Sequence, residues 1–192
     1  AATSDRPSGG PGISLGPLAP VVSDDAVEYS RVSLHIDRAR RVATLTVKAP
    51  DTPQPTTPEE IVQAGDAFWP LRAFRELDAA LLHLRIDEPL IGTVVVRTEG
   101  DAAAVLAVDQ ALVAHADHWL VREIVLFMKR TLKRMDLTAR SFFALIEPGS
   151  CFAGSLFELA LAADRSYMLD DPERPTAIAL SGMNGGPLRM SN

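Results

Sequence analysis

The sequence predicts an α/β protein in which parallel strands alternate with helices. Two apolar runs, at residues 91–96 and 142–146, have the composition of strands buried in a parallel sheet. Apolar residues recur at helical spacing over 71–84 and 119–135, so a helical segment lies before each run. Strands that are separated by helices favour a layered α/β fold.

The chain has 192 residues, which is enough for one domain with a full hydrophobic core. Its apolar share of 47% and charged share of 23% are ordinary for soluble globular proteins. The net charge of −6 argues against a nucleic-acid partner, because proteins that bind nucleic acid normally present a basic face.

Several sequence features indicate a cytoplasmic protein. A single cysteine, Cys151, excludes an internal disulfide and fits a reducing compartment. No apolar run approaches the roughly 20 residues of a membrane span, so no membrane partner is expected. The N-terminus lacks the basic start and apolar core of a signal peptide.

The N-terminal region differs in composition from the remainder. Residues 1–25 are rich in Gly, Pro and Ser without periodicity, which predicts an extended or disordered arm. Apolar and polar residues then alternate over 32–37 and 42–47, and a basic turn joins the two runs, which predicts a β-hairpin. We therefore expect an arm over 1–25 and one domain over 26–192.

Helices and strands alternate after the hairpin. Thr57-Pro58-Glu59-Glu60 is a helix start, with an N-cap candidate, Pro at the first position and acids near the positive helix end. The helix over 71–84 and the strand over 91–96 follow. Residues 102–114 are small and apolar, and they fit either a loop or a helix. An amphipathic helix is predicted over 119–135, with basic residues clustered toward its end.

The strand at 142–146 leads into a Pro148-Gly149-Ser150 turn, a helix of small residues over 153–163, and a short strand at 167–169. The sequence ends at Asn192 without a closing helix. We therefore expect the domain to be incomplete at its C-terminus.

The strand, turn and helix over 142–164 form the segment with the clearest chemical potential. A helix that begins after a glycine turn presents unpaired backbone N–H groups, which can hold a developing oxyanion. Glu158 lies close enough to the helix start to exchange a proton with the same bound group. The alternative is that the small residues serve close packing alone, and that Glu158 is a solvated or ion-paired helix residue.

This segment resembles the signature of the crotonase (enoyl-CoA hydratase/isomerase) superfamily, and residues 158–164, Glu-Leu-Ala-Leu-Ala-Ala-Asp, match it closely. Residues 91–98 resemble the family's strand before its first oxyanion loop, and 107–109 fall where the family commonly has Gly, a variable residue and Asp. The resemblance covers about residues 30 to 186. It implies a repeated ββα spiral with parallel sheet layers flanked by helices, here with the C-terminal helices missing.

Residues 149–169 are most similar to the superfamily's lyases that open the ring of 2,3-oxygenated, dearomatised benzoyl-CoA. The resemblance implies an enzyme of aerobic benzoate degradation that consumes water, releases formate and proceeds through a thioester enolate held by an oxyanion hole. It implies a CoA-thioester substrate, no cofactor and a homo-oligomer. The alternatives are another crotonase activity (acyl-CoA hydratase, isomerase or thioester hydrolase) and a non-catalytic acyl-CoA-binding module.

The resemblance also implies which backbone N–H groups form the oxyanion hole. Val108 would supply the first donor. Gly154 or Ser155 would supply the second, because this chain has one more residue between Gly149 and Glu158 than the usual family spacing.

Glu158 matches the family's first catalytic glutamate. The family's second acidic position falls about at Gly182, so Glu147 and Asp109 are the acids that we expect to substitute for it. The resemblance places three further residues against the substrate: Ala107, Cys151 and Phe152.

Three other groups have two interpretations each. Cys151 fits a small core residue better than a nucleophile, because no histidine is near it in sequence. His115 and His118, three residues apart, could share a helix face and suggest a metal, but no carboxylate or cysteine pattern completes a site, so no metal is expected. The basic residues at 129–134 suit a solvated helix end, or alternatively the phosphates of CoA.

Overall fold

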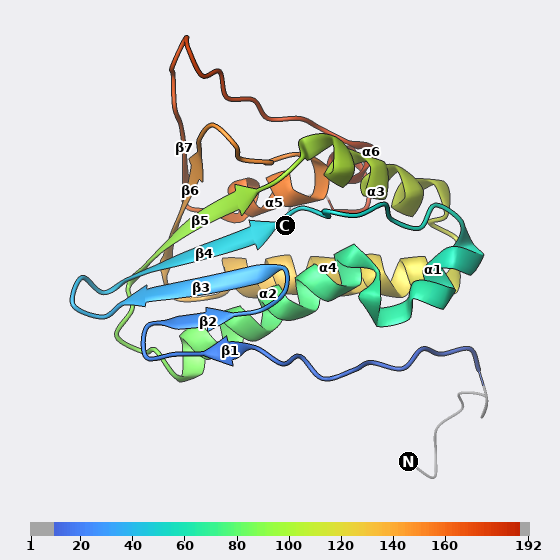
Figure 1. Cartoon of the computed structure of the whole chain (residues 1–192), viewed down its shortest axis with the longest axis horizontal. Coiled ribbons are helices and arrows are strands. Elements are labelled where there is room, and N and C mark those ends of the chain that lie inside the picture. The colour runs from blue at the N-terminus through green and yellow to red at the C-terminus, as the bar shows by residue number, and fades with distance from the viewer. Residues whose placement is uncertain (1–9, 189–192) are drawn as a thin grey trace.

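The structure is a computed structural model that describes residues 10–188, and residues 1–9 and 189–192 lie outside that description. Within the described residues, seven strands form one sheet in the order β1-β2-β3-β4-β5-β6-β7, so strands that are neighbours in sequence are also neighbours in the sheet (Figure 1). The pairs from β1 to β4 are antiparallel, and the pairs from β4 to β7 are parallel. The predicted α/β class is therefore confirmed.

The strands are β1 (Val21–Val22), β2 (Ala26–Glu28), β3 (Val32–Asp37), β4 (Val42–Lys48), β5 (Thr93–Glu99), β6 (Ser141–Ile146) and β7 (Arg165–Met168). The helices are α1 (Pro58–Ala64), a 3-10 turn (Gly65–Ala67), α2 (Trp69–Ile86), α3 (Ala102–Ala114), α4 (Trp119–Asp136), α5 (Gly154–Ala162) and α6 (Gly182–Gly185). The hairpin and both apolar strands therefore form where the sequence predicts them.

The parallel strands bury alternate residues rather than continuous runs. In β5, Val94 and Val96 are inaccessible to solvent while Val95 between them is half-buried. β6 repeats this pattern, with Phe142 and Ala144 buried and Phe143 half-buried. The continuous apolar runs had suggested strands buried on both faces, and this expectation needs correction. Within the described residues, one face of the sheet is fully covered and the other is covered in part.

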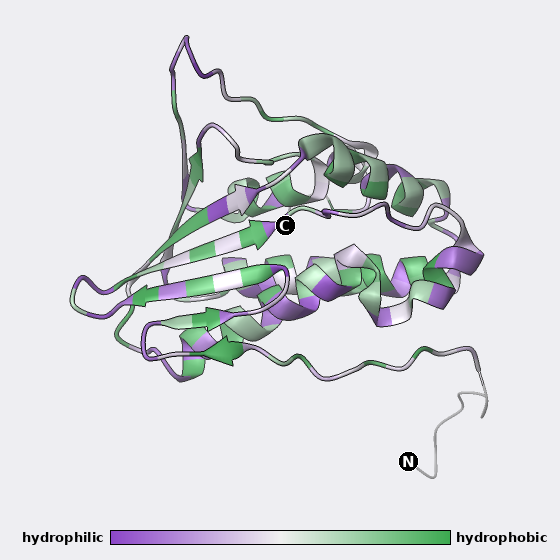
Figure 2. Cartoon of the chain, in the orientation of Figure 1, coloured by the Kyte–Doolittle hydropathy of each residue, from purple (hydrophilic) through white to green (hydrophobic). Residues whose placement is uncertain are grey.

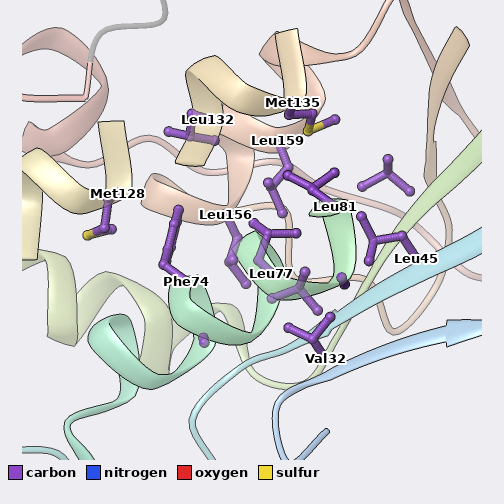
Figure 3. Packing of buried hydrophobic residues seen from close by; sticks show 14 of the residues in the cluster. Val32, Leu45, Phe74, Leu77, Leu81, Met128, Leu132, Met135, Leu156 and Leu159 are labelled. Carbon is purple, nitrogen blue, oxygen red and sulfur yellow. The ribbon is translucent and has the colours of Figure 1, made fainter. Parts of the chain in front are cut away.

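The main core lies between this covered face and helices α2, α4 and α5. Phe74, Leu77 and Leu81 of α2 lie in one cluster with apolar side chains of the strands, of α4 and of α5 (Figure 3). Figure 2 shows the matching alternation of apolar and polar residues along β3 and β4. Burial of these side chains provides the main driving force for the fold, at about 25 cal/mol per Å² of apolar surface.

The start of α1 confirms the predicted cap. The Thr57 hydroxyl accepts from the backbone N–H of Glu60 at 3.3 Å, and the Glu60 carboxylate accepts from the backbone N–H of Thr57 at 3.2 Å. This reciprocal pair is a capping box. Residues 102–114, which fitted a loop or a helix, form α3. The Asp101 side chain caps α3 by accepting from the N–H of Ala103.

The described part of the expected arm, residues 10–25, is irregular except for β1, which pairs antiparallel with β2. Residues 1–9 of the arm lie outside the described residues. No helix in the described part of the chain is both long and apolar enough to cross a membrane.

The C-terminal segment returns to the start of α5. After β7 the chain is irregular until Ala179, which bridges to Ala153 in parallel, and α6 follows. The carbonyl oxygen of Ala179 accepts from the N–H of Gly154, and that of Phe152 accepts from the N–H of Ala179. These contacts place α6 against α3 and α5, as Figure 1 shows.

Candidate active site

The candidate site lies at the carboxyl ends of the parallel strands. Residues 50–56 follow β4, residues 100–101 lead from β5 into α3, and residues 147–153 lead from β6 into α5. Parallel strands bring their carboxyl ends to the same edge of a sheet, where α/β proteins commonly bind ligands. The sheet therefore places the starts of α3 and α5 at this edge, although they are far apart in sequence.

The start of α5 requires a glycine at position 154. Gly154 has φ of +46°, which is a left-handed conformation that residues with a Cβ rarely adopt. A Cβ at this position would lie 1.9 Å from Asp109 Oδ2 and 2.9 Å from Ser181 Oγ. The glycine thus lets a carboxylate and a hydroxyl approach the first turn of the helix.

Both predicted oxyanion donors at the helix start hold an oxygen atom of the chain itself. The N–H of Gly154 donates to the carbonyl of Ala179 at 2.9 Å. The N–H of Ser155 donates to Asp109 Oδ2 at 2.7 Å. The positive end of a helix stabilises a negative charge, so a carboxylate oxygen at this position is favourable. The N–H groups at the start of α5 therefore bind one neutral carbonyl oxygen and one carboxylate oxygen.

Asp109 reaches this position from α3 and is completely buried. Its Oδ2 atom accepts from the N–H of Ser155 and also from the hydroxyl of Ser181 at 2.6 Å. Burial raises the pKa of Asp109 above its ordinary value, because a charged carboxylate loses its hydration there, while the hydrogen bonds from Ser181 and Ser155 oppose the shift.

Two buried oxygen atoms at the start of α5 have no hydrogen-bond partner among the described residues. They are Oδ1 of Asp109 and Oγ of Ser155. Both oxygen atoms lie beside the Asp109 Oδ2 atom that accepts from Ser155 and Ser181, so the polar groups at the start of α5 are grouped in one buried place.

Glu158 is completely buried in α5, one turn after the helix start. Its Oε1 atom accepts a hydrogen bond from the side-chain amide of Asn184 at 2.7 Å. The same amide group donates to the carbonyl of Gly154 at 2.9 Å. The interpretation of Glu158 as a solvated surface residue is therefore wrong.

Ser181 and Asn184 join the two acids into one network, and neither was a predicted site residue. Ser181 donates through its hydroxyl to Asp109 and through its backbone N–H to Asn184 Oδ1, at 2.9 Å. Asn184 then donates to Glu158. A local signal existed, because Ser181 followed three residues later by Asn184 has the form of a helix cap.

Glu147, the other expected acid, lies elsewhere. Its side chain is 41% exposed and pairs with Arg97 of β5 at 2.9 Å. Gly182, at the family's second acidic position, begins α6 and packs near Val113. Of the two acids expected to replace the second glutamate, the fold therefore brings Asp109, and not Glu147, into the network with Glu158.

Val108 needs correction as an oxyanion donor. It lies in the interior of α3, where each N–H group bonds to the carbonyl four residues earlier. Its amide is therefore committed to the helix. The expectation came from the family resemblance of residues 107–109, and the small apolar residues from Ala102 onward form a continuous helix capped by Asp101.

The three expected substrate-binding residues divide into two groups. Ala107 is exposed and lines a cavity of about 360 Å³ between the start of α3 and the loop at 50–56. Cys151 and Phe152 are completely or almost completely buried in the hydrophobic core, so their expected place on the substrate surface needs correction. Burial also raises the pKa of the Cys151 thiol, which disfavours the thiolate that a nucleophile requires.

His115 and His118 lie at the ends of two different helices, α3 and α4. Nε2 of His115 lies 2.9 Å from the carbonyl oxygen of Thr56, which ties α3 to the loop after β4. In the part of the chain that the structure describes, no group of three or more His, Cys, Asp or Glu residues is placed to hold a metal ion.

No protein-family model matches the chain. Benzoyl-CoA-dihydrodiol lyase from Aromatoleum evansii is 48% identical over 192 residues, which is 100% of this chain and 35% of that protein. The chain thus spans about a third of the length of this curated relative. The resemblance inferred from residues 149–169 is confirmed by this identity.

Two solved structures show more distant likeness. One is an enoyl-CoA hydratase from Geobacillus kaustophilus HTA426, which is 17% identical with a TM-score of 0.48 and covers 74% of this chain and 47% of that chain. The other is an enoyl-CoA hydratase/isomerase from Xanthobacter autotrophicus Py2, which is 21% identical with a TM-score of 0.46 and covers 73% of this chain and 46% of that chain.

Proposed function

We propose, from the likeness to benzoyl-CoA-dihydrodiol lyase, that this chain contributes the acyl-CoA site of a carbon–carbon lyase of the crotonase type. The 48% identity along the whole chain is the observation that carries the proposal. The enzyme would open the ring of 2,3-oxygenated, dearomatised benzoyl-CoA with consumption of water and release of formate. The proposal extends to a cytoplasmic homo-oligomer that needs no metal or redox cofactor.

The start of α5 would bind the thioester oxygen. The N–H groups of Gly154 and Ser155 already hold a carbonyl oxygen and a carboxylate oxygen. A substrate oxygen would replace the Ala179 carbonyl and Asp109 Oδ2 at these donors. Negative charge that develops on this oxygen in the enolate is stabilised by the same N–H groups, and each such donor contributes about 2.7–4 kcal/mol of transition-state stabilisation.

Glu158 would transfer protons at the bound acyl group. Its burial beside the helix start keeps bulk water away from the carboxyl group, which strengthens electrostatic interactions within the site. Asp109 would act as the second acid, because its elevated pKa suits a group that gives and takes protons. The network through Ser181 and Asn184 links the two carboxyl groups.

A non-catalytic acyl-CoA-binding module is the second candidate. One observation favours it: the Glu158 carboxyl group is completely buried and is not exposed where a substrate would approach. Another acyl-CoA activity of the crotonase type, as a hydratase, isomerase or thioester hydrolase, would use the same donors with a different substrate.

Formate release from 2,3-oxygenated benzoyl-CoA is the direct test. We expect the parent to release formate and Glu158→Gln to lose about 10²–10⁴-fold of that rate, which is the usual contribution of a positioned acid–base group. Glu59→Gln changes an exposed glutamate of α1 and should retain the parent rate. Circular dichroism of each variant establishes that it is folded.

Two results would contradict parts of the proposal. An inert parent rejects ring opening by this chain, and turnover of an enoyl-CoA or binding of benzoyl-CoA then separates the two alternatives. If the folded Glu158→Gln variant releases formate at the parent rate, only the role of Glu158 is rejected and the lyase activity stands.

A further inference from the structure

We infer that Asn184 is a positioning residue that fixes the Glu158 carboxyl, so that Oε1 accepts a hydrogen bond and Oε2 is the oxygen that carries the transferred proton. This inference rests on the proposed function and adds to it. Asn184 lies in the C-terminal segment, 26 residues after Glu158, and its side chain reaches back into the site.

The orientation of the Asn184 amide is determined by two of its partners, the N–H of Ser181 and the carbonyl of Gly154. The backbone N–H of Ser181 can only donate, so the side-chain atom that it meets, at 2.9 Å, must be the carbonyl oxygen. The carbonyl of Gly154 can only accept, so the atom facing it at 2.9 Å must be the NH₂ group. A flipped amide would place like groups against each other at both positions.

The NH₂ group has two hydrogens, and both are used. One points to the carbonyl of Gly154 and the other to Glu158 Oε1, at 2.7 Å. Oε1 is therefore an acceptor in either protonation state of Glu158. When Glu158 is protonated, its proton resides on Oε2, because a proton on Oε1 would oppose the hydrogen of the amide.

The cap of α6 holds this amide in place. Ser181 and Asn184 form a capping box, in which the Ser181 hydroxyl accepts from the N–H of Met183 at 3.1 Å. Met183 is completely buried beneath the same turn. The turn therefore fixes both the position and the orientation of the amide before any ligand binds.

In the described part of the chain, most charged side chains on the elements packed against α5 are exposed to solvent or paired with another residue, and they do not join the hydrogen-bond network of Glu158 and Asn184. Asp109 of α3 is the titratable group in the same hydrogen-bond network. Arg165 of β7 is exposed, and Arg97 of β5 pairs with Glu147. The charged side chains of α4 are exposed, apart from Arg134, which pairs with Asp78 of α2.

Direct titration of Glu158 tests the inference without requiring activity. The carboxyl carbon of Glu158 is followed by NMR in ¹³C-labelled protein and is assigned by its absence in Glu158→Gln. Asn184→Asp keeps the side-chain shape but replaces the donor to Oε1 with an acceptor. We expect it to raise the titration midpoint of Glu158 by more than about one pH unit, because the loss of a donor and a new negative charge both disfavour the carboxylate.

Two variants separate this effect from general loosening. Asn184→Ala removes the donor without adding charge and should raise the midpoint by less, and it serves if Asn184→Asp does not fold. Met183→Ala opens a cavity under the same turn but keeps the amide, so it should shift the midpoint less than either Asn184 variant.

The possible outcomes have distinct meanings. Identical titrations of parent and Asn184 variants, including no titration in any of them, overturn the inference, as does an equal shift in Met183→Ala. Where formate is released, its pH–rate profile should move upward in Asn184→Asp together with the NMR midpoint. If the Asn184 variants shift the Glu158 midpoint but the parent releases no formate, the positioning role is supported and the proposed function is rejected separately.

Discussion

Asp109 and Glu158 reach one hydrogen-bond network from different helices, and neither side chain is exposed to solvent. Their surroundings nevertheless differ. Asp109 places Oδ2 on the positive end of α5 and leaves Oδ1 unpaired among the described residues. Burial raises the pKa of Asp109 by more than the hydrogen bonds from Ser181 and Ser155 lower it. The protonated acid is therefore favoured more than in an exposed aspartate.

This shift predicts a pH dependence of stability. A folded chain with a raised pKa keeps the Asp109 proton at pH values where the unfolded chain has lost it. The stability from this group is therefore fully present below the ordinary pKa of 3.8 and is lost as the pH rises through the folded value. We expect Asp109→Asn, which cannot ionise, to become progressively more stable relative to the parent as the pH rises across this range.

Urea unfolding at a series of pH values measures this difference. The exposed Asp117→Asn provides the control for removing one negative charge. Parallel curves for the parent and Asp109→Asn, with a constant difference in the free energy of unfolding, would show that burial does not raise the pKa of Asp109.

At the level of single elements, α5 depends on the backbone at its first residue. Gly154 is left-handed, and the space beside its Cα is filled by the carboxylate of Asp109. Gly149, in the preceding turn, is also left-handed with φ of +87°, but nothing lies within 4 Å of the position of its Cβ. The two glycines therefore share a conformational requirement and differ in the available space.

Alanine substitutions separate these two requirements. We expect Gly149→Ala to lower the free energy of unfolding by about 1–2 kcal/mol, which is the cost of a left-handed residue with a Cβ. Gly154→Ala should cost about 1–3 kcal/mol more, because Asp109 must move out of an already packed position. Chemical denaturation of both variants measures the difference. Equal losses would mean that Asp109 moves freely and that its contact with Ser155 contributes little.

At the scale of the whole molecule, Asp66 ties the N-terminal segment to the helical layer. Its Oδ2 atom accepts from the N–H of Gly16 at 2.7 Å. The same atom lies 3.2 Å from Nη1 of Arg75 and 3.4 Å from Nη2 of Arg72. Arg75 also donates to the carbonyl of Gly16 at 2.7 Å. The segment thereby borders an apolar groove of about 730 Å³ between α2 and α4, which Ile13 also lines.

Removing this tie should release the segment while the domain stays folded. We expect Asp66→Ala to increase amide hydrogen exchange over residues 10–20 at least tenfold, because opening then costs about 1.4 kcal/mol less, as expected for one charged hydrogen-bond acceptor. Asp136→Ala removes a different ion pair, the one with Lys133 on α4, away from this groove, and should leave this exchange unchanged. Equal protection in Asp66→Ala and the parent would show that apolar contacts hold the segment.

The sequence by itself determined the elements that depend on local patterns. The cap at Thr57, the alternation along β3 and β4, and the spacing of Phe74, Leu77 and Leu81 all act within a few residues, and each predicted element is present. Glu158 and the helix start at Gly154 were identified in the same way, because strand, turn and helix are contiguous.

Only the tertiary structure decided which distant groups meet at the site. Asp109 contacts Ser155 across 46 residues, and Asn184 contacts Glu158 across 26. These pairs form because parallel strands bring the starts of α3 and α5 to one edge, and because the C-terminal segment folds back over them. Local pattern contains no information on such separations. It therefore left residues 102–114, which include Val108, open as a loop or a helix, and it left the choice between Glu147 and Asp109 open.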